Sequence, residues 1–357
     1  MRIRIIILIF LALLLTSCNI EGSDGKMEGK LNTEKDLLQL KEDSKDVIVS
    51  KKMDLLNESD EVASGFDGFD KVLSFIPDEE FIQNESVQGD DFSYLKLPKT
   101  KSIISGKLKY ENNTKENIVV QSIFLQGNKN IKIKTTNSTK WVPAIIFDVA
   151  PHTSITINID LKWDKDGMQE LTFFPLEKNS DAYRYNGSSL GSYRFFVQSK
   201  DINIGKDLIQ EQVFNLSQSK LSSIQNFLPE PYWMGENNTE LEYLIKKKKP
   251  LTNEKINSLK FEPVPYNTTV DVLLIDEYGN TSIVEENIRI KSNKNTFINL
   301  DKNILNRMYK NNRRHFFLIM NNREEGIIAD VKALQLYKKP FPTSFQKVLE
   351  FYKTDKQ

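Results

Sequence analysis

The chain has little of several residue types on which protein chemistry often depends. Among its 357 residues there is one cysteine, Cys18, so no disulfide can form within the chain. Its two histidines, His152 and His315, lie far apart in the sequence, which argues against a zinc site. No apolar run reaches the roughly 20 residues of a transmembrane helix. Lysine plus arginine (49) balance aspartate plus glutamate (49), which argues against nucleic acid as a partner.

What the first residues do contain is the pattern of an export signal. Arg2 and Arg4 precede an apolar run of about 11 residues, Ile5 to Leu15, and the small residues Thr16 and Ser17 follow it. After Cys18 the chain turns at once to polar and charged residues, so the run does not continue into a membrane span. Residues 1–17 are therefore predicted to be a signal peptide.

The end of this signal carries a resemblance. Leu15-Thr16-Ser17-Cys18 resembles the lipobox of bacterial lipoproteins, which signal peptidase II cleaves in front of the cysteine. The resemblance implies that Cys18 carries a diacylglycerol with palmitate-like chains and becomes the first mature residue. Two acyl chains hold a protein on a membrane stably, whereas one does so only marginally. We expect a protein on a bacterial cell membrane, facing either the outside or the periplasm.

The segment that follows is predicted to connect the anchor to the folded body. Residues 18–65 are polar and rich in acidic residues, which predicts a flexible, disordered tether with a transient helix around Glu34 to Leu40. Residues 66–100 are predicted to form a partly helical lead-in, because the stretch from Phe66 to Phe81 is apolar enough to pack and is better explained by a helix start than by a calcium loop.

From residue 101 the apolar period changes to two, which is typical of strands. Residues 101–217 are predicted to form a first β-sandwich domain, with Asp164 to Gly167 as a hairpin loop and a strand from Gln212 to Leu216 that closes the domain. Val149 to Ser154 and the alternating Ile155 to Ile159 resemble a strand entry of immunoglobulin-like bacterial domains, and this resemblance implies only the sandwich class. The seven predicted strands are Ile103 to Tyr110, Asn117 to Leu125, Ile131 to Thr135, Val142 to Val149, Ser154 to Trp163, Glu170 to Pro175 and Tyr193 to Gln198.

The rest of the chain is predicted to repeat this architecture. Residues 218–254 are read as a helical linker interrupted by Pro229 and Pro231, residues 255–340 as a second β-sandwich domain and residues 341–357 as a C-terminal helix. The predicted fold class is thus mainly β, with two tandem immunoglobulin-like β-sandwich domains and a few short helices. The later predicted strands are Leu259 to Val264, Thr269 to Ile275, Ser282 to Ile290, Asn295 to Leu300, Arg314 to Met320 and Ile327 to Tyr337, with a short helix from Asp301 to Tyr309.

Aromatic residues near loops are the candidate contact residues. Tyr183, Tyr185 and Tyr193 surround a Gly/Ser turn, and Tyr232 and Trp233 follow a pair of prolines. Such residues supply large contact areas in binding loops. The alternative is that they pack in the core or between domains, as most aromatic side chains do.

Patterns that would indicate catalysis lack their context. Gly187-Ser188-Ser189-Leu190-Gly191 matches a nucleophile elbow, but a strand pattern rather than a helix follows it. The acidic turns Asp164 to Gly167 and Asp276-Glu277 could offer oxygen ligands to calcium, although such turns usually cap hairpins. No pair of acids stands out for glycoside hydrolysis. We therefore predict no catalytic residues, no metal, no cofactor and no enzymatic activity.

These observations favour a membrane-anchored envelope lipoprotein that acts as a binding or structural assembly module. Its expected partners are the membrane, through the lipid on Cys18, and an envelope protein or glycan. The alternative is an envelope protein that binds or degrades carbohydrate, with exposed aromatic side chains stacked on sugar rings. A solute-binding lipoprotein is a third possibility, but it would need two α/β lobes, and the strand-rich pattern argues against that.

Overall fold

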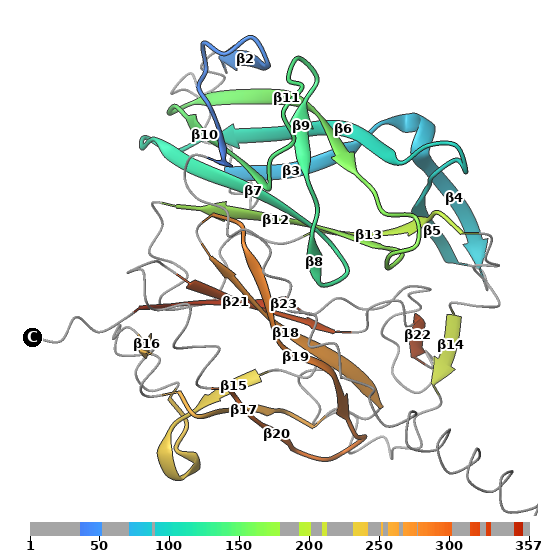
Figure 1. Ribbon diagram of the computed structural model, residues 1–357, viewed down its shortest axis with the longest axis vertical. Coiled ribbons are helices and arrows are strands. Elements are labelled where there is room, and N and C mark those ends of the chain that lie inside the picture. Colours follow the sequence, from blue (N-terminus) through green and yellow to red (C-terminus); the bar gives the residue numbers. More distant parts are fainter. Residues whose placement is uncertain are drawn as a thin grey trace, which may run out of the picture. The chain divides into compact units, whose positions relative to one another are not determined.

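The computed structural model is built mainly from β-strands (Figure 1). It describes residues 36–51, 71–87, 90–178, 193–200, 209–212, 231–241, 251–252, 256–263, 267–276, 278–301, 315–321, 326–329 and 346–352. Residues 32–357 form the larger of two units into which the chain divides. All the described residues belong to the larger unit.

Two sheets, stacked face to face, form what we call the first sandwich. One sheet has eight strands in the order β1-β10-β7-β12-β13-β5-β4, with β8 paired to β7, and the other has five in the order β2-β11-β6-β3, with β9 paired to β11. The strands are β1 (Leu38–Leu40), β2 (Val47–Lys51), β3 (Lys71–Pro77), β4 (Ile82–Val87), β5 (Asp90–Lys96), β6 (Ile103–Asn112), β7 (Ile118–Gln126), β8 (Lys129–Asn130), β9 (Ile133–Thr135), β10 (Ala144–Val149), β11 (Thr153–Lys162), β12 (Glu170–Glu177) and β13 (Tyr193–Gln198).

Alternating side chains from both sheets fill the space between them. In β11 the isoleucines Ile155, Ile157 and Ile159 are at most 1% exposed, and the residues between them are half-buried or exposed. Phe124 of the eight-stranded sheet packs edge-on against Phe75 of the five-stranded sheet, with ring centroids 5.0 Å apart. The period of two in the sequence is thus the spacing of inward-facing positions.

The remaining strands form what we call the second lobe, which contains sheets of three and five strands. Their orders are β15-β17-β20 and β16-β23-β21-β18-β19, and β14 pairs with β22 in a separate ladder. The strands are β14 (Ile209–Gln212), β15 (Pro231–Met234), β16 (Leu251–Thr252), β17 (Ser258–Phe261), β18 (Thr268–Asp276), β19 (Thr281–Ile290), β20 (Thr296–Asn299), β21 (His315–Asn321), β22 (Gly326–Ala329) and β23 (Gln346–Tyr352), and the short helical turns are η2 (Glu79–Phe81) and η5 (Glu236–Asn238).

Strand β18 is buried on both of its faces. Val272 and Leu274 lie on one face, while Leu273 and Ile275 lie on the other and belong to the same apolar cluster as the core of the first sandwich. The turn after β18 lies against that sandwich as well. A Cβ on Gly279, whose φ is +77°, would lie 3.4 Å from the Cβ of Ala144. The second lobe therefore shares part of its core with the first sandwich.

The mainly β fold class is confirmed. All seven strands predicted between residues 101 and 198 are present, and Tyr193–Gln198 has the predicted bounds. The turn at Tyr278-Gly279-Asn280 joins β18 to β19 in an antiparallel hairpin. Asp164 to Gly167, by contrast, connects two strands of different sheets and is an arch rather than a hairpin, because β11 pairs with β6 and β12 pairs with β7.

The predicted tether and lead-in are wrong where the structure describes them. Within residues 18–65, β1 pairs with β10 and β2 pairs with β11, so this segment adds one strand to each sheet. Leu40 is 4% exposed, and it lies in a strand rather than a helix. Within residues 66–100, Lys71–Pro77 is strand β3 and only the three-residue turn η2 is helical. Averaging composition over the acidic segment concealed short aliphatic runs that long-range pairing stabilises.

The predicted boundaries after residue 200 also need correction. Residues 231–234 of the expected helical linker form β15, and Gln346–Tyr352 of the expected C-terminal helix forms β23, paired with β21. The helical spacing of Val348, Leu349 and Tyr352 is outweighed by tertiary strand pairing. Of the predicted closing strand Gln212 to Leu216 only Gln212 lies within the described residues, where it ends β14, which pairs with β22. Of the predicted helix from Asp301 to Tyr309 the structure describes only Asp301, and within the expected helical linker Glu240 forms a β-bridge with Met234.

Tyr110 offers a test of this core through pH. Its side chain is fully buried and its hydroxyl forms a hydrogen bond with the Ser122 hydroxyl. Burial raises the pKa of Tyr110 far above the ordinary value of 10, and the bond to Ser122 opposes this only in part. In the unfolded chain this tyrosine ionises near pH 10, whereas in the folded chain it stays protonated. Above pH 10 the free energy of unfolding should therefore fall by about 1.4 kcal/mol per pH unit for this one proton.

We therefore expect Tyr110→Phe to flatten the loss of stability between pH 10 and 11. The measurement is urea unfolding at a series of pH values. Ser122→Ala is the matched control, since it removes the same hydrogen bond but keeps the ionisable phenol, and its slope should remain that of the unmodified chain. Equal slopes for Tyr110→Phe and the unmodified chain would contradict the expectation.

Candidate functional site

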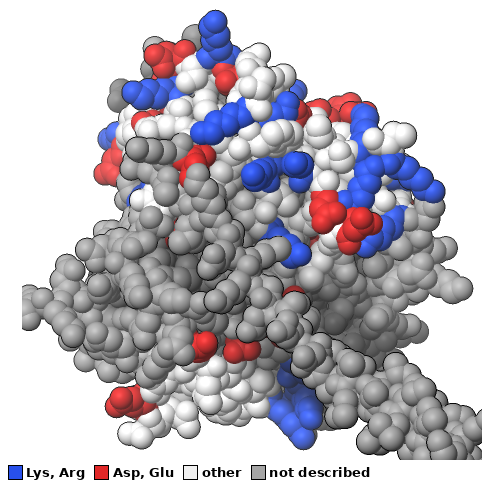
Figure 2. Space-filling model, in the orientation of Figure 1, with Lys and Arg blue, Asp and Glu red and all other residues white. Residues whose placement is uncertain are grey.

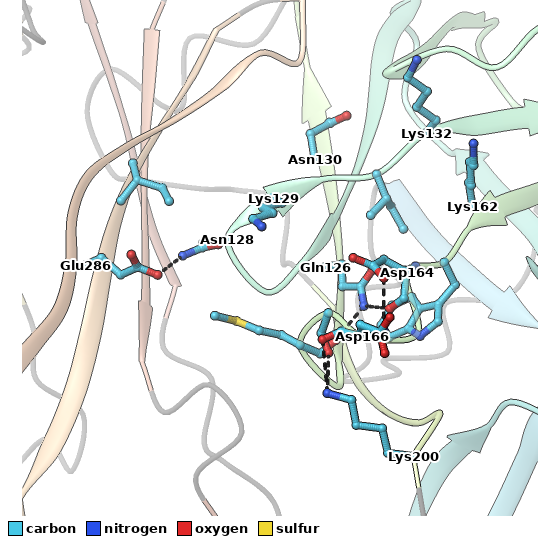
Figure 3. A pocket seen from close by; sticks show the side chains of 15 residues that line it. Gln126, Asn128, Lys129, Asn130, Lys132, Lys162, Asp164, Asp166, Lys200 and Glu286 are labelled. Carbon is cyan, nitrogen blue, oxygen red and sulfur yellow. Dashed lines mark hydrogen bonds between the residues drawn. The ribbon is translucent and has the colours of Figure 1, made fainter. Parts of the chain in front are cut away.

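A pocket of about 920 Å³ lies where the turn after β7, the arch after β11 and one strand of the second lobe meet (Figure 3). Ten of its fifteen lining residues are polar or charged, and four of these are lysines. The lining residues are Gln126, Asn128, Lys129, Asn130, Ile131, Lys132, Lys162, Trp163, Asp164, Asp166, Gly167, Met168, Lys200, Ile283 and Glu286.

The side chain of Gln126 fixes the arch that forms one wall. Its amide nitrogen donates to the carbonyl oxygens of Asp164 (2.6 Å) and Met168 (2.9 Å), and its amide oxygen accepts from the backbone N–H of Asp164 (3.1 Å). Gly127, with φ +57°, makes the turn beside it, and a Cβ there would collide with Met168. The wall is therefore held by backbone geometry and one fully bonded amide.

Asn128 closes the pocket on the side of the second lobe. Its side chain is 3% exposed, and its amide nitrogen donates to Oε1 of Glu286 at 2.7 Å and, at a longer 3.4 Å, to Oδ2 of Asp271. Asp271 is fully buried and also accepts from the backbone N–H of Asn287. One edge of the pocket is therefore formed by polar contacts between the first sandwich and the second lobe.

The lysines differ in how they are bound. Lys200 donates from Nζ to the carbonyl oxygens of Asp166 (3.2 Å) and Gly167 (3.3 Å). The ammonium groups of Lys129, Lys132 and Lys162 are exposed, and no ion pair or hydrogen bond joins them to any residue that the structure describes. Three cationic groups of one pocket are therefore available to a ligand.

No pattern in the sequence singles out these lysines. The turn Asp164 to Gly167, predicted as a hairpin loop and a possible calcium turn, instead binds Lys200 Nζ through the carbonyl oxygens of Asp166 and Gly167. Among the described residues no group of three or more His, Cys, Asp and Glu side chains could hold a metal ion. Isolated lysines in a chain with 49 basic residues give no signal, because only the strand register brings these together.

The predicted aromatic contact residues lie in different environments. Trp233 is 1% exposed and lies in the core instead of on a contact surface. The Tyr232 hydroxyl donates to Oε1 of Glu262 at 2.7 Å, and Lys260 Nζ lies 5.6 Å from the centre of the Tyr232 ring. Tyr193 is in strand β13, while Tyr183 and Tyr185 lie outside the described residues, as do Cys18 and the Gly/Ser motif at 187–191.

The three tryptophans do not form a sugar-stacking surface. Trp163 is 3% exposed and Trp233 is 1% exposed, so both rings are enclosed by protein. Trp141 is half-buried, and Nζ of Lys134 lies 5.4 Å from the centre of its ring. Stacking on sugar rings needs an open aromatic face, which the enclosed rings of Trp163 and Trp233 do not present.

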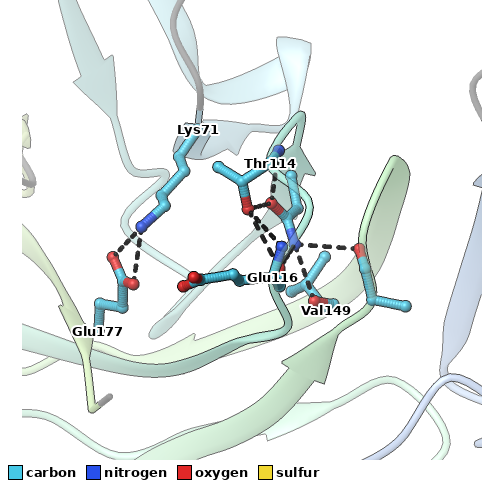
Figure 4. A network of polar contacts seen from close by, with 7 residues as sticks. Lys71, Thr114, Glu116, Val149 and Glu177 are labelled. Atoms are coloured by element: carbon cyan, nitrogen blue, oxygen red, sulfur yellow. Dashed lines mark hydrogen bonds and ion pairs between the residues drawn. The ribbon is translucent and has the colours of Figure 1, made fainter. Parts of the chain in front are cut away.

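Buried carboxylates in the described part of the chain have structural partners. Glu177 accepts two hydrogen bonds from Lys71, a contact that joins β12 of one sheet to β3 of the other (Figure 4). Glu170 is 3% exposed and forms an ion pair with Arg194, which is 7% exposed. Asp276 accepts from the backbone N–H groups of Tyr278 and Asn280. These acids are occupied in holding the fold.

The polar network next to Glu177 holds the turn between β6 and β7. Asn112 is fully buried, and its amide nitrogen donates to the carbonyl oxygens of Glu116, Val149 and Ala150 (Figure 4). Its amide oxygen accepts from the backbone N–H and the hydroxyl of Thr114. A buried amide with all its bonds made rigidifies the chain around it.

Charges of both signs are interspersed on the described surface that Figure 2 shows. Within the part of the chain that the structure describes, no helix is long and apolar enough to cross a membrane.

Comparison with known proteins gives weak structural similarities. No protein-family model matches the chain, and no curated protein does. The chain is similar to the CupB2 chaperone of Pseudomonas aeruginosa, with 10% identity over 72% of this chain and 97% of that one and a TM-score of 0.18. It is similar to the Escherichia coli chaperone DraB, with 11% identity, coverage of 71% and 92% and a TM-score of 0.19. An adhesin from Mobiluncus mulieris has 6% identity, coverage of 74% and 81% and a TM-score of 0.19. TM-scores this low carry no argument about function.

Proposed function

We propose that this protein is a lipid-anchored component of a bacterial envelope and acts there as a non-catalytic binding or assembly module. The observation that carries the proposal is the signal pattern that ends at Cys18, ahead of a β-rich body. The chain's only cysteine stands directly behind an apolar run of signal-peptide length. A diacylglycerol there gives two buried acyl chains, enough for stable attachment.

The side chains of the body support a binding role over catalysis. The buried acids Glu170, Glu177 and Asp276 are each held by hydrogen bonds or ion pairs within the fold. A general acid or base must be free to exchange a proton with a substrate. The described surface instead offers loops and a lysine-lined pocket on a rigid double-sheet frame, which is how β-sandwiches commonly present binding sites.

The proposal is tested by chemical crosslinking of the lipidated protein in its own envelope, followed by purification and mass spectrometry. We expect a reproducible protein partner that is crosslinked through loops of the body. The matched sample is the chain with Cys18→Ala, which should lose that partner because it no longer concentrates on the membrane. Retained glycan without any protein partner would instead support carbohydrate binding, and turnover of that glycan would contradict a non-catalytic role.

A further inference from the structure

The segment from Lys129 to Thr135 crosses from one sheet of the first sandwich to the other. Strand β8 pairs with β7, the backbone N–H of Ile131 donates to the carbonyl oxygen of Phe124 at 3.0 Å, and β9 then pairs with β11. Ile131 and Ile133 are buried, whereas Lys132 between them is exposed. The crossing therefore turns Lys132 toward solvent at the edge of the pocket.

The register at this crossing brings two like charges together. Lys134 pairs with Asp160 and Ile133 with Leu161, and one step further the backbone N–H of Lys162 donates to the carbonyl oxygen of Lys132 at 2.9 Å. Lys134 and Asp160 form an ion pair at 3.0 Å. Lys132 and Lys162 instead lie side by side and point in the same direction (Figure 3). Like charges directly across two strands destabilise a sheet.

Where a sequence places like charges together without an opposite charge to offset them, the reason is often a function of that site. Lys129 adds a third cation to the same pocket. Of the pocket acids, Glu286 accepts the amide of Asn128, and Asp164 accepts the backbone N–H of Asp166. Neither acid forms an ion pair with Lys132 or Lys162. An anion placed between these two lysines would supply the charge compensation that the described residues lack.

We propose that this pocket binds a phosphate group, held between Lys132 and Lys162. A phosphate ester offers several strong acceptor oxygens, so a single group can bind more than one ammonium. The pocket volume of about 920 Å³ leaves room for the molecule that carries the phosphate. The inference deepens the proposed function, because it assigns a ligand class to the binding module.

The course of the chain favours a phospholipid headgroup as the source of the phosphate. Strand β1 pairs Leu38 with Ile145 at the start of β10, and just before β10 the carbonyl oxygen of Pro143 accepts from the side chain of Asn130, which lines the pocket. Leu38 therefore lies at the pocket end of the eight-stranded sheet, and it follows Cys18, the proposed lipid anchor, by only 20 positions in the sequence.

The test uses the full chain with Cys18→Ala, so that an attached lipid cannot mask binding. Trp163 lines the pocket beside Lys162, and with Trp141→Phe and Trp233→Phe added the fluorescence of the chain comes from Trp163 alone and should change when the pocket is occupied. We expect inorganic phosphate and sn-glycerol 3-phosphate to change this signal with a saturable dependence on concentration, and acetate at equal ionic strength to have no effect. In Lys132→Gln/Lys162→Gln the apparent affinity should fall about 30-fold, since each lysine near an anionic group contributes about 1 kcal/mol, or about fivefold in affinity.

The matched control is Lys107→Gln, which removes an exposed lysine of strand β6, outside the pocket, and should bind phosphate normally. The double variant should unfold at the same or a higher temperature than the unmodified chain, because it loses a like-charge pair. Lys132→Gln alone provides a milder second variant. Equal affinities for the double variant and the control, or an equal response to acetate, would overturn the proposal.

Vesicles then identify the source of the phosphate. Vesicles of phosphatidylglycerol should bind the protein with both pocket lysines more strongly than the Lys132→Gln/Lys162→Gln variant. Vesicles of phosphatidylcholine should bind the two proteins equally and weakly. Saturable binding of the two soluble phosphates without any difference between variants on phosphatidylglycerol would support the site and assign it to a free phosphate. None of these measurements depends on whether Cys18 is lipidated, so failure of the anchor and failure of the site are separable.

Discussion

Replacement of Cys18 by alanine is expected to move nearly all of the protein out of the membrane fraction. The thiol is the only atom in the chain to which a diacylglycerol can be attached in a lipobox-like pattern, because Cys18 is the only cysteine. Each buried CH₂ of an acyl chain contributes about 0.8 kcal/mol to membrane binding, so the loss of two chains removes the main attachment. The measurements are fractionation of cells and metabolic labelling with a palmitate analogue.

The control for this experiment is Ser17→Ala, which keeps a small residue before the cysteine and leaves the thiol in place. It should be labelled and retained as the unmodified protein is. Membrane retention together with labelling of Cys18→Ala would refute lipidation at Cys18. Retention without labelling would mean that another contact holds the protein, and the phosphate-binding pocket would then be the first candidate to test.

The strands of the first sandwich were predictable because their signal is local. Each inward position of β11 carries an isoleucine from Ile155 to Ile159, and the polar residues between them face outward. Such alternation encodes both the strand and its buried face. Pairing partners follow from no local signal, which is why the arch at Asp164 to Gly167 was mistaken for a hairpin.

The misplaced elements are short strands that depend on distant partners. Val47 to Val49 is a brief aliphatic run within a charged segment, and it becomes a strand because β11 offers a free edge. Gln346–Tyr352 has apolar residues at helical and at strand spacing alike, and β21 decides between them. In both segments, tertiary pairing supplies the hydrogen bonds that local propensity leaves undetermined.

The lysine pocket could not be predicted for the same reason. Lys132 and Lys162 are 30 positions apart, and a shift of the β9–β11 register by one residue would turn one of them away from the other. The predicted contact residue Trp233, in contrast, has a composition typical of binding loops but is buried. Aromatic composition alone does not distinguish a contact residue from a core residue.

The second large effect concerns the shared core. Leu273 is fully buried and belongs to the apolar cluster of the first sandwich, although β18 is a strand of the second lobe. Leu273→Ala should destabilise the protein by about 2 to 5 kcal/mol, the usual cost of removing a buried leucine side chain. Because its contacts span both parts of the fold, we expect the two parts to lose stability together and to unfold in a single transition.

Tryptophan fluorescence can follow the unfolding of the first sandwich and of the second lobe separately. In a Trp233→Phe background, fluorescence during urea unfolding comes from Trp141 and Trp163 and follows the first sandwich. In a Trp141→Phe/Trp163→Phe background it comes from Trp233 and follows the second lobe. Leu273→Ala should lower both midpoints equally. Val272→Ala is the matched control on the opposite face of β18, where the apolar contacts lie outside the shared cluster. If the two midpoints differ and Leu273→Ala leaves the first-sandwich midpoint unchanged, the first sandwich and the second lobe are independent domains. The hydrogen bond between Asn128 and Glu286 would then be only a contact between their surfaces.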